Sequence, residues 1–118
     1  MRTEGQLSPE MQRCIDACME SHSSCEQTMS YCLQQGGRHV DMAMMGALMD
    51  CSDITRLCAD MTMRRSPMAM EMARMCAQVA AKCAEACMAM SGDATMKGCA
   101  DKCRACADAC KAMAAMRA

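Results

Sequence analysis

Apolar and polar residues alternate along most of this chain with the period of an α-helix. Segment 96–113 shows the pattern best, because its sequence, MKGCADKCRACADACKAM, repeats cysteine at steps of four, three and four residues. On a helix that turns about 100° per residue, these four side chains fall within an arc of roughly 60°. The segment is therefore predicted to form an amphipathic helix that carries a row of sulfur on one face.

Local signals divide the chain into four such segments. Ser8 and Ser66 are each followed by proline, a combination typical of a helix N-cap with proline at the first helical position. Glycines at 36 and 37 and the Ser-Gly-Asp sequence at 91–93 are typical helix breaks. The predicted helices cover about residues 9–35, 41–63, 67–90 and 94–116.

The composition of these segments excludes strands. They are rich in Ala, Met, Glu, Gln, Lys and Arg and poor in β-branched residues. Four helices of similar length with short connections predict an all-α fold, an antiparallel up-down-up-down four-helix bundle. We expect residues 1–118 to form this single domain around a cysteine-lined core.

Cysteine lies on the apolar face of every predicted helix, and its spacing within a helix is always three, four or seven residues. The thirteen positions are, helix by helix, Cys14, Cys18, Cys25 and Cys32; Cys51 and Cys58; Cys76, Cys83 and Cys87; Cys99, Cys103, Cys106 and Cys110. On the first helix, Ser21 and Thr28 fill the turns of the same line that lack a thiol.

The usual materials of a protein core are nearly absent. The chain has no Phe or Trp, one Tyr, four Leu, two Ile and two Val, so its apolar fraction rests on Ala, Cys and 19 Met. A buried thiol contributes less to stability than a buried leucine, so packing alone does not account for thirteen of them. The interior is predicted to be largely sulfur, placed there for its chemistry.

Charge and hydropathy exclude two kinds of partner. With 13 basic and 14 acidic residues, the net charge of −1 gives no field that would attract nucleic acid or an anionic membrane surface. The chain also lacks the run of about eighteen apolar residues that a membrane span needs. We expect neither nucleic acid nor a membrane as a partner.

Disulfides are an alternative use of the cysteines. Residues seven apart on one helix are separated by about 10.5 Å, beyond the limit of about 7 Å between the α-carbons of a disulfide. Bridges between helices remain open, which keeps a disulfide-stapled structural helical protein as an alternative. An iron–sulfur protein is disfavoured, because the one Cys-x2-Cys spacing, Cys103 to Cys106, falls within a helix.

Binding of soft metal ions is the other possible use of the cysteines. Thiolates select soft ions, and Cu(I) accepts two or three sulfurs with little directional demand. Zinc needs four ligands in a tetrahedron, which straight helices supply less easily. One Cu(I) per thiolate also leaves the interior neutral. We therefore predict a non-enzymatic store of multiple Cu(I) ions, with a general soft-metal or zinc buffer as the alternative.

One end of the bundle gathers other soft ligands. The connections at 36–41 and 91–95 lie at the same end of an up-down bundle, so His39 and Met44 are predicted to line a mouth where copper enters. Met90 and Met96 are weaker candidates at that end, and His22 is expected to be solvated or hydrogen-bonded. Met42, Met45 and Met49 form a separate stripe that we expect at an interface between protomers.

Rows of Cys-x3-Cys and Cys-x6-Cys on four consecutive helices, in a chain of this length with almost no aromatic residues, resemble the bacterial copper storage proteins. The resemblance covers about residues 9–113. It implies a bundle whose interior cysteines bind many Cu(I) ions, a mouth near His and Met residues, and assembly as a homotetramer. A copper chaperone or a copper enzyme is the further partner that it suggests.

The same resemblance bears on the cellular compartment. The family has a cytosolic branch and an exported branch with a twin-arginine signal. Residues 1–13 lack the apolar segment of a secretory signal, which favours a cytoplasmic protein. The alternative is a periplasmic protein after removal of a signal, because the cysteine and methionine content is more like that of the exported branch.

Overall fold

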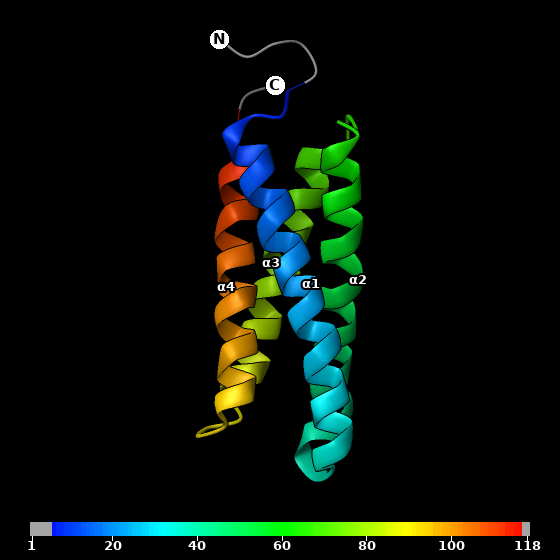
Figure 1. Ribbon diagram of the computed structural model, residues 1–118, viewed down its shortest axis with the longest axis vertical. Coiled ribbons are helices and arrows are strands. Elements are labelled where there is room, and N and C mark those ends of the chain that lie inside the picture. Colours follow the sequence, from blue (N-terminus) through cyan, green and yellow to red (C-terminus); the bar gives the residue numbers. More distant parts are fainter. Residues whose placement is uncertain (1–5, 117–118) are drawn as a thin grey trace.

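The computed structural model describes residues 6–116 and contains four long helices joined by short connections (Figure 1). The elements, in chain order, are α1 (Pro9–Gln35), the 3₁₀ turn η1 (Gly37–Val40), α2 (Met42–Met63), α3 (Ala69–Met88) and α4 (Ala94–Ala114). The described residues include no strand. The predicted all-α four-helix bundle is confirmed.

Two helices begin with a side-chain cap. The Ser8 hydroxyl accepts a hydrogen bond from the backbone N–H of Met11, with Pro9 at the first position of α1. The Asp93 carboxylate does the same for the backbone N–H of Met96 in α4. Gly36, with φ of 70°, ends α1, because few other residues adopt that conformation without strain.

The start of α3 differs from the sequence-based expectation. The Ser66 hydroxyl accepts from the backbone N–H of Met68, and its carbonyl accepts from the N–H of Ala69. These bonds form a separate turn at 66–68, and the helix starts at Ala69, two residues later than the Ser-Pro signal indicates. The turn uses the hydroxyl that would otherwise cap the helix.

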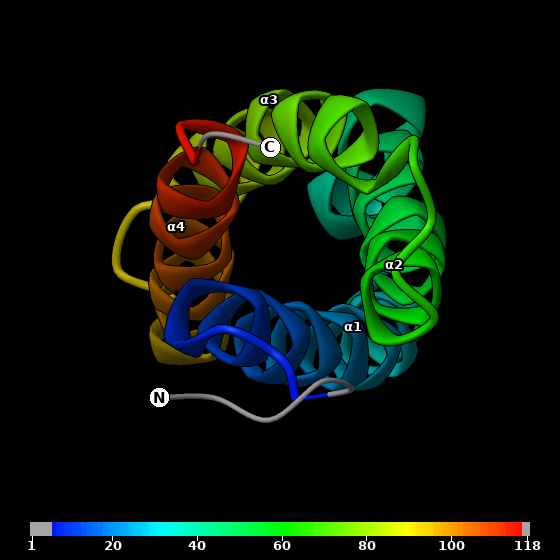
Figure 2. The same ribbon diagram turned by 90° about the horizontal axis from the view of Figure 1, so that it is seen from above.

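Each helix packs against two neighbours in a ring: α1 contacts α2 and α4, and α3 contacts the same two helices from the opposite side (Figure 2). The bundle measures 51 × 20 × 18 Å. The α1–α2 and α3–α4 connections lie together at one end, called the mouth below, while the start of α1, the α2–α3 connection and the end of α4 lie at the other (Figure 1).

Small side chains fill the interior. Buried alanines occur on α2, α3 and α4, and the largest fully buried side chains are Leu48, Met96 and Met113. The buried polar side chains among the described residues are serines and threonines, with no charged group among them. No helix in the described part of the chain is both long and apolar enough to cross a membrane.

Candidate metal centre

All thirteen cysteines lie in the core, as the sequence pattern predicts, with at most 1% of any of them exposed. They all fall within the described residues, and none of them forms a disulfide. Their inward direction follows from the spacing of three, four and seven, which keeps one face of each helix toward the bundle axis. The thiols of all four helices thus face the interior of the bundle.

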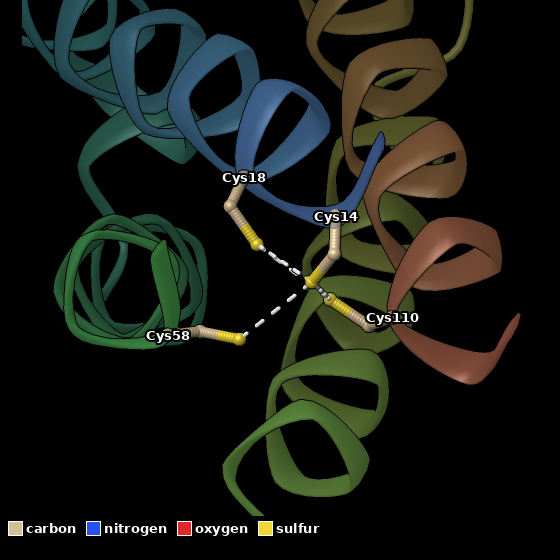
Figure 3. A group of neighbouring side chains, drawn as sticks. All are labelled: Cys14, Cys18, Cys58 and Cys110. Carbon is tan, nitrogen blue, oxygen red and sulfur yellow. Dashed lines mark hydrogen bonds between the residues drawn. The ribbon is translucent and has the colours of Figure 1, made fainter. Parts of the chain in front are cut away.

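The first close group draws thiols from three helices. Cys14 Sγ lies 3.6 Å from Cys110 Sγ, 3.9 Å from Cys58 Sγ and 4.0 Å from Cys18 Sγ. Figure 3 shows the four sulfurs turned toward one another from α1, α2 and α4. All four lie within 4.8 Å of each other, which is close enough to share one ion.

A second group overlaps the first. Cys18 Sγ lies 3.6 Å from Cys110 Sγ, 3.7 Å from Cys106 Sγ and 3.9 Å from Cys76 Sγ. These four thiols are again mutually within 4.8 Å, and Cys18 and Cys110 belong to both groups. Shared thiols suit ions of low coordination number, because one thiolate can bridge two such ions.

A third group takes one thiol from every helix. Cys103 Sγ lies 3.9 Å from both Cys25 Sγ and Cys51 Sγ, and Cys25 Sγ lies 4.0 Å from Cys83 Sγ. Ser21 adds a hydroxyl to this group, with its oxygen 3.6 Å from the sulfurs of Cys51 and Cys103.

The remaining thiols, Cys32, Cys87 and Cys99, lie toward the mouth. Cys32 Sγ is 3.8 Å from the thioether sulfur of Met96, and Cys87 lines a surface cleft of about 310 Å³ beside the α3–α4 connection. Helical angles alone place Met96 toward the edge of the cysteine face, but its side chain is fully buried. The helical pattern alone therefore did not predict the burial of Met96.

Burial acts to raise the pKa of the core thiols, whereas the hydrogen bonds between them raise the pKa of some, such as Cys18, and lower that of others, such as Cys58. Hydrogen bonds with Cys106 and Cys110, together with burial, raise the pKa of the Cys18 thiol. Burial is the largest cause that raises the pKa of Cys32, and the nearby carboxylate of Asp93 raises it further. Because a buried thiolate is costly without a cation and no charged side chain is buried beside these sulfurs in the described chain, the empty core favours neutral S–H.

His39 and Met44, the two predicted ligands at the mouth, have different surroundings. Met44 is buried, with 6% of its surface exposed. His39 is partly exposed, and its Nε2 lies 2.8 Å from a carboxylate oxygen of Asp93, which also accepts a hydrogen bond from the Tyr31 hydroxyl. This bond holds η1 against the α3–α4 connection.

The other histidine belongs to the wall of the bundle. His22 Nδ1 lies 2.7 Å from the backbone carbonyl oxygen of Ser52, so it donates a hydrogen bond from α1 to α2. The Ser52 hydroxyl in turn donates to the carboxylate of Glu26. The structure therefore gives His22 the hydrogen-bonded role expected for it.

Taken together, the fold and these distances define a class, the four-helix bundle with an interior lined by unbridged thiols. The sequence matches the model of the copper storage protein family over residues 7–115. The chain belongs to this family. A comparison with curated proteins found no match.

Solved structures of similar proteins agree with this family assignment. A protein of Nitrosospira multiformis is 30% identical and has a TM-score of 0.85, with 92% of this chain and 97% of that chain covered. The Cu(I)-bound copper storage protein Csp3 of Bacillus subtilis is 26% identical, with a TM-score of 0.83 and coverage of 90% and 99%. Ccsp of Streptomyces lividans, loaded with 10 copper equivalents, is 27% identical, with a TM-score of 0.82 and coverage of 90% and 84%.

Proposed function

We propose that this protein stores and sequesters multiple Cu(I) ions on the thiolates that line its interior, without catalysing a reaction. The observation that carries the proposal is a core of thirteen unbridged, buried thiols with no buried charged side chain beside them in the described chain. Such a core can hold thiolates only if cations enter with them, and one Cu(I) per thiolate keeps it neutral. Family membership and the copper-loaded relatives support the same function.

The proposed ligands are the thirteen cysteines, joined at the mouth by His39 and Met44. Each ion that binds a thiol displaces its proton, so the core exchanges H⁺ for Cu⁺ as it fills. The cleft beside Cys87 supports the mouth as the place where copper first meets a core thiol. His39 can take part once its bond to Asp93 opens, and the thioether of Met44 needs no deprotonation.

Anaerobic titration with Cu(I) against a competing chelator tests this function. Mass spectrometry under non-denaturing conditions then counts the ions per chain. We expect uptake on the order of one ion per thiol, with the reduced, empty protein as the starting state. Saturation at one or two ions per chain would contradict storage.

A general soft-metal or zinc buffer is the second candidate. Three sets of four thiols lie close together, and sulfurs 3.6–4.0 Å apart match the edge of about 3.8 Å in a tetrahedral zinc–thiolate site. The straight helices therefore supply four-thiol groups more readily than the sequence suggested. Competition decides the question: Zn(II) or Cd(II) that displaces Cu(I) at similar concentrations would favour the buffer.

A disulfide-stapled protein is distinguished by its thiol count. The storage function predicts nearly all 13 thiols free after reduction and removal of metal, with the helical content of the bundle retained. Loss of helix on reduction, measured by circular dichroism, would favour the structural role. The same preparation serves as the starting material for the copper titration.

The cytosol is the compartment that we assign, in line with the relative from Streptomyces lividans that is described as cytosolic.

We further propose a homotetramer, with a copper chaperone or copper enzyme as the exchange partner. Met42 and Met49 are 89% and 52% exposed on one stripe of α2 and offer an apolar contact. Met49→Glu is expected to lower the mass measured by light scattering, and Leu33→Glu on α1 serves as the control. A lower mass for Leu33→Glu and an unchanged mass for Met49→Glu would place the interface elsewhere.

A further inference from the structure

The thirteen thiols fall into two groups with few links between them. The deep group, farther from the mouth, has six members: Cys14, Cys18, Cys58, Cys76, Cys106 and Cys110. The mouth group has seven: Cys25, Cys32, Cys51, Cys83, Cys87, Cys99 and Cys103. Every thiol–thiol contact of 4.0 Å or less, including that of 4.0 Å between Cys106 and Cys110, joins two members of the same group.

Three residues occupy the break between the groups. On α1, α2 and α3, the inward position between the last thiol of one group and the first of the other is Ser21, Thr55 and Ala80, and each is fully buried. Thr55 turns its hydroxyl back to its own helix, 2.7 Å from the carbonyl oxygen of Cys51. We call these three residues the divider. None of them offers a soft ligand.

The fourth helix crosses the break without a divider. On α4, Cys103 of the mouth group and Cys106 of the deep group are three residues apart, a rise of about 4.5 Å along the helix. This is the one place where thiols of the two groups lie on successive inward positions of a helix. On α4, therefore, no inert residue interrupts the row of thiols, and a copper ion can step between the groups along this helix.

We propose that the protein holds copper in two compartments, a mouth group and a deep group, which the divider separates and which exchange ions along α4 through Cys103 and Cys106. The proposal rests on the proposed copper storage and adds an internal order to it. In each step, a Cu–S bond forms to the incoming sulfur as that thiol loses its proton. The bond to the outgoing sulfur breaks as that sulfur takes up a proton, so copper stays Cu(I) and charge is conserved.

Release kinetics test the two compartments. Protein fully loaded with Cu(I) is mixed anaerobically with excess bathocuproine disulfonate, and the coloured copper complex is followed with time. We expect two phases, with amplitudes in a ratio of about seven to six, because the mouth group empties first and the deep group drains through α4. A single phase from the fully loaded protein would overturn the proposal.

Ser21→Cys places a thiol in the divider, where the native oxygen already lies 3.6 Å from two sulfurs of the mouth group. It is expected to merge the two phases into one. Thr28→Cys is the matched control, because Thr28 is buried one heptad away on the same line but lies inside the mouth group. It adds the same thiol and should leave two phases. Equal effects of the two variants would contradict the divider.

Two further variants keep the test decisive. Ala80→Cys fills the divider from α3, in case Ser21→Cys disturbs the fold, and should also merge the phases. Cys106→Ser removes the step on α4 and should slow the second phase more than Cys14→Ser, which removes a deep thiol away from the step. Total capacity reports on storage itself: if wild-type protein binds many ions but releases them in one phase, storage stands and the compartments do not.

Discussion

At the residue scale, a few side chains each have more than one role. The cysteines pack the core and are at the same time the proposed copper ligands, while serine and threonine hydroxyls occupy inward positions of α1 and α2 that lack a thiol. Asp93 has the widest role outside the core. One carboxylate oxygen caps α4, and the other accepts hydrogen bonds from Tyr31 and His39. It therefore joins three elements at the mouth.

Replacement of Asp93 by alanine is expected to lower the melting temperature of the empty protein, because the cap and both connecting bonds are lost. Asp101→Ala is the control, since Asp101 makes only exposed ion pairs within α4.

The contribution of Asp93 should also depend on pH. The hydrogen bond from His39 is the main cause that lowers the pKa of Asp93 to about 2. The depressed pKa stabilises the fold above about pH 4, and this contribution is lost as pH falls toward 2. The difference between wild type and Asp93→Ala should shrink over that range.

Proton release is the second prediction at this scale. A hydrogen bond with Cys83 acts to lower the pKa of Cys87, but a hydrogen bond with Cys99 and burial outweigh it and raise that pKa to about 12. Thiols with raised pKa values remain protonated at pH 8.5, where an ordinary thiol is about half ionised. Burial without a neutralising cation disfavours the other thiolates as well, so uptake of one Cu(I) per thiol should release close to one proton per ion at pH 8.5, as a pH indicator in weak buffer would show. Glutathione, the control, should release about half as many.

At the scale of the helix, the sequence determines which face points inward but not how the helices align. Spacings of three, four and seven predicted the inward direction of every cysteine, and Ser8 and Pro9 mark the start of α1. The contact between Cys14 and Cys58 depends on the vertical alignment of α1 and α2, which η1 and its neighbouring turns set. No local pattern encodes that alignment, so neither the two thiol groups nor the divider could be predicted.

The mouth shows the same limit. The sequence placed His39 at the correct end, because connection order alone decides that. Its partner Asp93 is 54 residues away and meets it only after the two connections pack together. The full burial of Met96 was not predicted for a related reason, since a periodic pattern takes no account of the packing at the end of a bundle.

Packing of the helices leaves little spare volume at the buried alanines. Ala100 on α4 has no exposed surface, so Ala100→Leu forces extra carbon into a filled site and should lower the free energy of unfolding by about 1–3 kcal/mol. Ala105→Leu, at an exposed position of the same helix, should change it by less than about 0.5 kcal/mol. Urea unfolding of the empty proteins measures both. Similar losses in the two variants would argue against a closely packed wall.

At the scale of the whole molecule, four helices surround a core that contains thiols in place of large apolar side chains. Four leucines, two isoleucines and two valines give little hydrophobic stabilisation compared with an ordinary core. Thiol contacts of 3.6–3.9 Å between α1, α2 and α4 bring the same helices together that bound ions would join.

Copper should therefore stabilise the fold strongly. Ions that bind the folded protein and not the unfolded chain raise stability with the logarithm of their concentration above the dissociation constant, about 4 kcal/mol at a thousandfold excess. We expect the melting temperature, followed anaerobically by circular dichroism, to rise with each copper added and to return to its initial value after a chelator removes the metal. An unchanged melting temperature at full loading would mean that copper binds outside the core.

The described residues place no charged side chain in the core, so one-for-one exchange of H⁺ for Cu⁺ would make loading electrically silent. The chain carries a net charge of −1 when empty, and it keeps that charge at every degree of filling. Ion-exchange chromatography should therefore not resolve full from empty protein, although their masses differ. A partner that delivers or withdraws copper cannot sense the load through long-range attraction. It has to recognise the mouth itself.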